Sequence, residues 1–193
     1  MTTTNVLLAG VGGQGTVLAG ELLSRAALAD GLDVKKSEIH GMSQRGGSVV
    51  SHVRFGREVF SPVIAVGEAD LLLSFERLEA LRYAPLLRPA GMVVLNRQSI
   101  LPAPVLAGVA TYPEEVEEPL RGRGLKVIAV DALELARVAG HPLTANVALL
   151  GVVSRYLSLT ESAWSEALEA QIKPALLEVN RRAFQLGREA GLD

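Results

Sequence analysis

The first segment that could bind a ligand is a short glycine-rich run, Gly10-Val11-Gly12-Gly13-Gln14-Gly15. Three of its glycines have the G-x-G-x-x-G spacing, which brings backbone N–H groups close to a bound molecule. If a helix follows the run, the positive end of that helix adds to the attraction for an anion. The run therefore predicts a site for a phosphate or pyrophosphate group, although glycines at such a turn can also serve only close packing.

A second segment, residues 37–47, gathers several kinds of chemically active side chain. It holds a carboxylate, an imidazole, a hydroxyl, an amide and a guanidinium, on Glu38, His40, Ser43, Gln44 and Arg45. The guanidinium of Arg45 suits a phosphate or a carboxylate because it makes forked contacts. Polar groups of a loop can also satisfy one another, which is the better interpretation of His40 alone. The loop as a unit favours a role in binding a ligand or a partner.

From these two segments we predict a binding site and assign no catalytic residue. The predicted cofactor- or substrate-binding residues are Gly10, Gly12, Gly13, Gln14, Gly15, Glu38, His40, Ser43, Gln44, Arg45, Gly46 and Gly47. The three histidines, His40, His52 and His141, are not spaced like the ligands of a zinc site, so no metal is predicted.

The elements around the first segment follow a strand–turn–helix–strand order. Residues 5–9 form a short apolar run typical of a buried strand, and residues 16–30 carry apolar side chains at helical spacing up to Gly31. Residues 34–39 form a plausible second strand. In a doubly wound fold the carboxyl ends of these strands border one crevice, so we expect the two glycine-rich segments to be neighbours in space.

The rest of the chain predicts further strands and a helical C-terminal part. Residues 48–55 and 58–64 are expected to form an antiparallel hairpin that turns at Gly56-Arg57, since glycine comes first in the turn. Residues 71–75, 92–96 and 126–131 are expected as strands, with a further short one at 109–112. Ser158 and Glu161 have capping-box spacing before a helix, and Pro174 suits the start of the last one.

These elements predict an α/β fold, namely a three-layer α/β/α Rossmann-like domain with a mainly parallel sheet, an antiparallel hairpin and a helical C-terminus. We expect one domain over residues 1–193, with residues 145–190 as its helical part. The nearly continuous apolar stretch from Ala145 to Leu157 predicts a helix that is buried in a core or an interface.

Composition excludes several classes of function. The chain has no cysteine, so it supplies no thiolate ligand for an iron–sulfur cluster, no thiol nucleophile and no disulfide. Any redox centre must therefore belong to a bound cofactor or to another chain. The net charge of −2 is scattered, which argues against nucleic-acid binding. No apolar run predicts a membrane helix or a secretory signal, so we expect a cytoplasmic location and no membrane partner.

A dinucleotide site would also need an acidic residue at the end of the second strand to hold a ribose. Glu38 is the only candidate there; it lies late and follows a Lys-Lys-Ser run. The NAD interpretation stays open but is not favoured.

Residues 10–23, Gly-Val-Gly-Gly-Gln-Gly followed by Thr-Val-Leu-Ala-Gly-Glu-Leu-Leu, resemble the gamma subunits and gamma domains of the 2-oxoacid:ferredoxin oxidoreductases. Residues 37–54, Ser-Glu-Ile-His-Gly-Met-Ser-Gln-Arg-Gly-Gly-Ser-Val-Val-Ser-His-Val-Arg, are similar in particular to the beta subunit of indolepyruvate ferredoxin oxidoreductase. Supporting similarities are Gly67-Glu68-Ala69-Asp70, Phe75-Glu76, Leu78-Glu79-Ala80 and Glu178-Val179-Asn180. The resemblance covers nearly the whole chain.

The resemblance implies a small subunit that binds no cofactor alone and is inactive by itself. The large partner would hold thiamine diphosphate and iron–sulfur clusters, the 2-oxoacid (indolepyruvate) would be decarboxylated there, ferredoxin would accept electrons, and coenzyme A would be the co-substrate. We expect the two glycine-rich segments to border a shared cleft and to position coenzyme A or the oxoacid. Two alternatives stay open: a free-standing NAD- or flavin-dependent Rossmann-type oxidoreductase, and a non-catalytic assembly domain.

Overall fold

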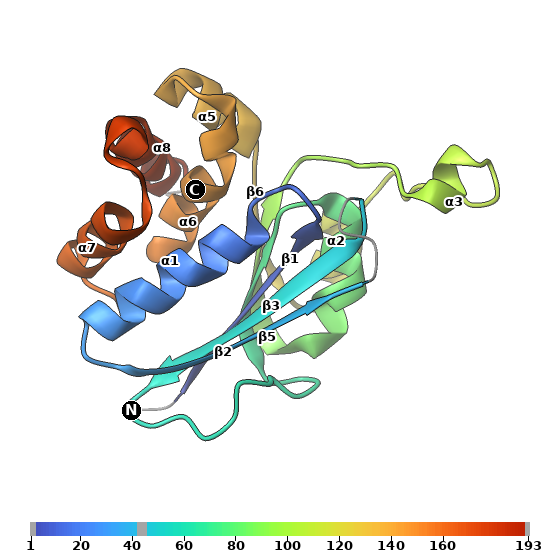
Figure 1. Ribbon diagram of the computed structural model, residues 1–193. Helices are drawn as coiled ribbons and strands as arrows, with labels where there is room; N and C mark the ends of the chain where they lie inside the picture. Colours follow the sequence, from blue (N-terminus) through green and yellow to red (C-terminus); the bar gives the residue numbers. More distant parts are fainter. Residues whose placement is uncertain (1–2, 42–45, 192–193) are drawn as a thin grey trace.

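A central sheet divides the protein into layers (Figure 1). The computed structural model describes residues 3–41 and 46–191. Within these residues the sheet has six strands in the order β2-β3-β1-β4-β5-β6. The strands are β1 (Thr4–Val11), β2 (Asp33–His40), β3 (Ser48–Gly56), β4 (Ala69–Ser74), β5 (Leu87–Asn96) and β6 (Lys126–Val130). β3 is antiparallel to both its neighbours and the other pairs are parallel, which confirms the predicted mixed sheet.

The antiparallel hairpin is formed by different strands from those predicted. β3 pairs with β2 on one side and with β1 on the other, so both of its edges are occupied. The expected partner, residues 58–64, therefore has no edge to join and contains no strand. Side chains of the sheet hold this segment instead: the Val59 N–H donates to Asp33 Oδ2 at 2.8 Å and the Ile64 N–H to His52 Nδ1 at 3.1 Å. The strand expected at 109–112 is also absent, because those residues leave the sheet entirely.

Helices cover both faces of the sheet. One face carries α1 (Thr16–Ala29), α5 (Ala132–Ala139), α6 (Ala145–Ser154), α7 (Glu161–Gln171) and α8 (Pro174–Ala190), with the 3₁₀ turn η2 (Pro142–Thr144). The other carries α2 (Arg77–Tyr83), η1 (Ala84–Leu86) and α4 (Glu117–Gly122). The short α3 (Ala103–Leu106) lies far from the sheet in Figure 1. None of the helices within the described residues has the length and apolarity to cross a lipid bilayer.

The apolar core follows from the strand period. On β1, Val6 and Leu8 point to the α1 face while Leu7 and Ala9 point to the α2 face, and all four are fully buried. A strand covered on both faces must be apolar at every position, which explains the continuous run in the sequence.

Helices α6 and α8 touch backbone to backbone. A Cβ atom on Gly151 would lie 2.0 Å from the Phe184 carbonyl oxygen, and one on Gly187 would lie 1.9 Å from that of Ala148. α6 is buried from residue 146 to residue 154, so the predicted apolar helix belongs to the core of the chain.

The cap of α7 differs from the predicted one. The Ala163 N–H donates to Thr160 Oγ1 at 3.3 Å, and the Thr160 N–H donates to Asp30 Oδ2 at 2.7 Å. Ser158 is too early to cap, because Leu159 is drawn into the core and the helix begins only at Glu161.

Candidate functional site

The first glycine-rich segment forms the turn between β1 and α1, as predicted. Gly15 has a φ of 79° and immediately precedes α1. The Gly12 N–H donates to the Gly47 carbonyl at 2.8 Å, so the two glycine-rich segments are neighbours in space, which confirms that prediction. The physical route is different, however, because Val11 pairs directly with Ser48 in the β1–β3 ladder and the antiparallel strand brings residue 47 to the turn.

Two glycines of the turn are required by packing. A Cβ on Gly10 would lie 2.9 Å from each of Gln14 Oε1, Phe75 Cβ and Thr16 Oγ1. A Cβ on Gly15 would lie 2.6 Å from Asn146 Nδ2, and its left-handed φ also disfavours other residues. Both positions therefore serve close approach inside the protein, as the packing interpretation of the spacing expects.

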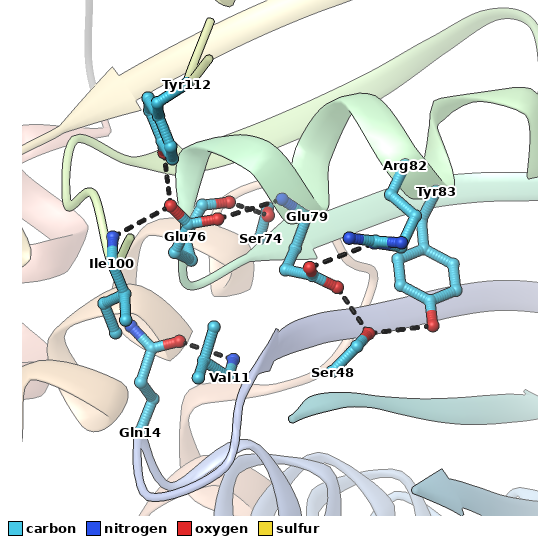
Figure 2. Close-up of polar contacts among 10 residues, drawn as sticks. All are labelled: Val11, Gln14, Ser48, Ser74, Glu76, Glu79, Arg82, Tyr83, Ile100 and Tyr112. Atoms are coloured by element: carbon cyan, nitrogen blue, oxygen red, sulfur yellow. Dashed lines mark hydrogen bonds and ion pairs between the residues drawn. The ribbon is translucent and has the colours of Figure 1, made fainter. Parts of the chain in front are cut away.

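The side chain of Gln14 joins three elements, and we call this arrangement the Gln14 latch. Its Oε1 accepts the Val11 N–H at 2.7 Å (Figure 2). Its Nε2 donates to the Phe75 carbonyl and to Gln98 Oε1, both at 2.9 Å. β1 leads to a helix on one face and β4 to a helix on the other, so the latch spans the switch point where doubly wound folds bind ligands. The amide of Gln14 is therefore already bonded to protein, and its predicted contact with a ligand stays a prediction.

A cavity of about 630 Å³ lies on the α1 side of the turn. Its lining includes Gly12, Gly13, Thr16, Val17, Val49 and Gln171. Thr16 is 3% exposed, and its hydroxyl has no hydrogen-bond partner among the described residues. The first α1 bond inside the helix is from the Ala19 N–H to the Gly15 carbonyl, so the N–H groups before it lack intrahelical acceptors. Such a helix terminus can bind a phosphate or carboxylate group.

Glu38 and His40 lie on β2, which β3 separates from β1. Glu38 Oε1 is 2.9 Å from Lys36 Nζ, and the same ammonium pairs with Glu21 Oε2 at 2.9 Å. The hydrogen bond that Lys36 donates to Glu21 lowers the pKa of the Glu21 carboxyl group. His40 is exposed, with Nδ1 3.3 Å from the Gly41 carbonyl oxygen. The structure thus does not place Glu38 next to the turn, where a ribose-binding acid would be needed.

The remaining predicted residues belong to the connection between β2 and β3. Ser43, Gln44 and Arg45 lie outside the described residues. Gly46 has a φ of 75°, and a Cβ atom at this position would meet no other atom within 4 Å among the described residues. The binding roles of these residues stay predictions.

The structure adds a polar cluster around a buried carboxylate beside this connection, which the sequence interpretation missed. The Ser48 hydroxyl donates to Glu79 Oε2 at 2.5 Å and lies 3.1 Å from the Tyr83 hydroxyl (Figure 2). Arg82 Nε donates to Glu79 Oε1 at 3.0 Å. Glu79 is only 4% exposed, so these bonds offset the cost of burying its charge. The cluster fixes the residue that directly follows the second glycine-rich segment.

A second buried carboxylate, on Glu76, organises the neighbouring segment. It is 1% exposed and accepts the N–H groups of Glu79 at 3.0 Å and Ile100 at 3.1 Å, as well as the Tyr112 hydroxyl. Burial, and then the bond to Glu76, raise the pKa of Tyr112 to about 12. Two acidic residues at the end of an apolar strand are the signal that could have indicated these clusters.

Within the described residues, no group of three His, Asp or Glu side chains could hold a metal ion.

A mixed sheet between two layers of helices, with a glycine turn at the β1–α1 junction, defines a Rossmann-like class of protein. Residues 5–190 match the family described as pyruvate ferredoxin/flavodoxin oxidoreductase, and the chain belongs to this family. It is 43% identical to the indolepyruvate oxidoreductase subunit IorB of Thermococcus kodakarensis, over 98% of this chain and 96% of the relative.

Solved structures agree with this assignment. The gamma subunit of a keto/oxoacid ferredoxin oxidoreductase from Geobacter sulfurreducens is 25% identical, with a TM-score of 0.74 over 98% of both chains. A 2-oxoglutarate:ferredoxin oxidoreductase from Magnetococcus marinus shares the fold, with a TM-score of 0.77 and 19% identity. This similarity covers 99% of this chain but 31% of that one, so the same fold there occupies part of a longer chain.

Proposed function

We propose that this chain is the small subunit of an indolepyruvate:ferredoxin oxidoreductase. The observation that carries the proposal is its 43% identity to a subunit of indolepyruvate oxidoreductase across nearly the full length of both chains. The expected partner is a large subunit with thiamine diphosphate and iron–sulfur clusters, which supply the decarboxylation and electron-transfer chemistry. Coenzyme A is the expected co-substrate, ferredoxin the expected electron acceptor, and the cytoplasm the expected location.

Within such a complex, the cavity beside the glycine turn would hold an anionic group of coenzyme A or of the oxoacid. Two observations support this role: the open N-terminus of α1, and the Gly12–Gly47 contact that brings the second segment to the same place. A helix terminus stabilises a phosphate or carboxylate through its N–H groups and its dipole. This chain would therefore bind and orient a reactant, while the bond-breaking steps take place in the large subunit.

The test of the complex is a dye-reduction assay that requires both indolepyruvate and coenzyme A. We expect no activity from this chain alone or from the large subunit alone, and activity after co-expression of the two. Tight NAD binding by the isolated chain would support the free-standing dehydrogenase instead. Full activity of the large subunit without this chain would support the assembly-domain alternative.

The test of the cavity places a negative charge at its rim. Val17 lines the cavity and is 47% exposed, and Val138, which is 55% exposed on α5, provides the matched control. Val17→Asp should raise the KM for coenzyme A about fivefold, because the new carboxylate would repel the bound anion. A charge near a helix terminus contributes about 1 kcal/mol, which corresponds to about that factor. A rise in the oxoacid KM alone would assign the site to the oxoacid, and unchanged values for both would refute the cavity's role. Val138→Asp should change neither constant.

Arg45 is tested in the same assay on sequence grounds alone. Arg45→Ala should raise the KM for coenzyme A or for the oxoacid, because a forked contact with a phosphate or carboxylate is lost. Unchanged kinetics for both substrates would remove Arg45 from the proposed site.

A further inference from the structure

Residues 99–112, which we call the apolar arm, leave the body between β5 and α4 (Figure 1). The arm contains no charged residue, and its apolar side chains are nevertheless open to solvent. Leu106 is 71% exposed and Val109 is 78% exposed. No residue of α3, the helix within the arm, is buried.

Such exposure is unusual because apolar surface in water costs about 25 cal/mol per Å². Single exposed apolar residues are common on proteins, and Val138 is one, next to the charged Arg137. An uncharged stretch of this length is different, since contiguous apolar patches mark surfaces that meet another molecule. Long connections without extensive secondary structure are also usually functional or disordered.

The arm is held in place at both of its roots. The Ile100 N–H and the Tyr112 hydroxyl, one near each end, both donate to Glu76 Oε1. The next residue, Arg77, repeats the pattern: its N–H donates to the Gln98 carbonyl at 3.0 Å and its Nη2 to the Glu114 carbonyl at 2.6 Å. A buried carboxylate that joins the two roots favours an ordered arm over a disordered connection.

We propose that the apolar arm docks into an apolar groove with a basic rim on the large subunit of the oxidoreductase. This inference rests on the proposed function, since it needs that partner. The chemistry of the rim follows from Glu114 and Glu115, which are exposed at the root of the arm and favour Lys or Arg opposite them. The same charges disfavour a second copy of this chain, because a symmetric exchange of arms would bring two acidic roots together.

The position of the arm supports the same partner. Gln98, directly before the arm, accepts a hydrogen bond from Gln14, so the root of the arm contacts the glycine turn that borders the proposed binding site. The related fold that occupies 31% of a longer oxidoreductase chain shows that a domain of this shape occurs joined to further parts of such an enzyme.

The experiment measures binding of the isolated chain to the large subunit by titration calorimetry, and confirms it by co-purification through a tag on the large subunit. Leu106→Asp and Val109→Asp should each weaken binding at least about 30-fold, as expected when a charge enters the centre of an apolar interface. Val138→Asp, a control on α5 whose side chain is also exposed, should bind like the wild type. The thermal midpoints of the isolated variants should match that of the wild type, which shows that folding is intact; Leu106→Gln repeats the test if Leu106→Asp fails this check.

The rim is tested by charge reversal. Glu114→Lys with Glu115→Lys should weaken binding, and the loss should shrink as salt is added because exposed charges are screened. Binding of this double variant that equals or exceeds that of the wild type would overturn the basic rim.

Three results would overturn the arm's role. Wild-type affinity in both aspartate variants refutes docking, and the proposed function still stands if the complex reduces dye. A wild-type chain that does not bind the large subunit at all refutes both. An isolated dimer that Leu106→Asp converts to a monomer in sedimentation experiments assigns the arm to a second copy of this chain instead.

Discussion

Replacing Gln14 by leucine removes all three hydrogen bonds of the Gln14 latch and keeps a side chain of similar size. The Val11 N–H, on a residue that is 8% exposed, loses its acceptor. The Phe75 carbonyl loses one of two donors and keeps the amide of Asn96 at 3.1 Å. The two backbone groups are therefore affected unequally.

The magnitude follows from that inequality. A buried N–H group without an acceptor costs about 1–3 kcal/mol, and one lost bond to a carbonyl that keeps another contributes about 1 kcal/mol. The variant Gln14→Leu should thus lose about 2–4 kcal/mol of unfolding free energy. For a chain of this size that loss corresponds to a fall of about 4–16 °C in the thermal midpoint.

Urea unfolding of the isolated chain, followed by circular dichroism, measures this difference. The matched control is Gln98→Ala, which removes an exposed side chain that bonds to Gln14 and, at 3.3 Å, to Asn96 Nδ2, and should cost less than about 1 kcal/mol. If Gln14→Leu unfolds at the same urea concentration as the wild type, the latch is not a structural element. If the control is equally destabilised, the bond between the two side chains, rather than the backbone bonds, carries the stability.

Three further predictions concern stability. Gly151→Ala should lower the unfolding free energy by at least about 3 kcal/mol in urea titration, since its Cβ would meet the Phe184 carbonyl at 2.0 Å; a smaller loss would mean that the helices separate easily. Ser48→Ala should cost about 1–2 kcal/mol in the same titration, because Glu79 Oε2 loses its donor, and no loss would show that water replaces it. Burial, and then the charge of Arg54, lower the pKa of His52. The contribution of the neutral imidazole to the unfolding free energy should therefore be fully present above the unfolded pKa of about 6.5 and decline as the pH falls below it. Urea titrations at about pH 7.5 and 5.5 should show this decline in the wild type and not in His52→Asn.

Local patterns predicted the parts of the fold that depend on neighbouring residues. The glycine turn, the helix after it and the C-terminal helices all follow from spacing within a few residues. The partner of β3 did not follow, because a strand pairs with whichever edge the rest of the chain leaves free. Residues 58–64 have a strand-like composition, but β1 and β2 already occupy both edges of β3.

The candidate site shows the same division. The contact between the two glycine-rich segments was predicted from the general geometry of the fold and is present at Gly12 and Gly47. The buried carboxylates were not assigned roles, because the partners of Glu76 lie 24 and 36 residues away and the Ser48 hydroxyl that donates to Glu79 lies 31 residues away. Only the folded chain brings such groups together.

The reversed direction of β3 has a consequence for how this fold can diversify. In a purely parallel sheet, the chain that leaves the carboxyl edge must cross the sheet through a helix before it returns. Here a two-strand excursion goes out along β2 and comes back along β3, so the connection between His40 and Ser48 returns to the very edge where it began. We therefore expect that this connection can be replaced by that of a relative while the strand register on either side is preserved. A graft of it from a relative with another 2-oxoacid preference should move substrate discrimination and leave the unfolding free energy nearly unchanged, and the opposite pattern would show that the segment belongs to the scaffold.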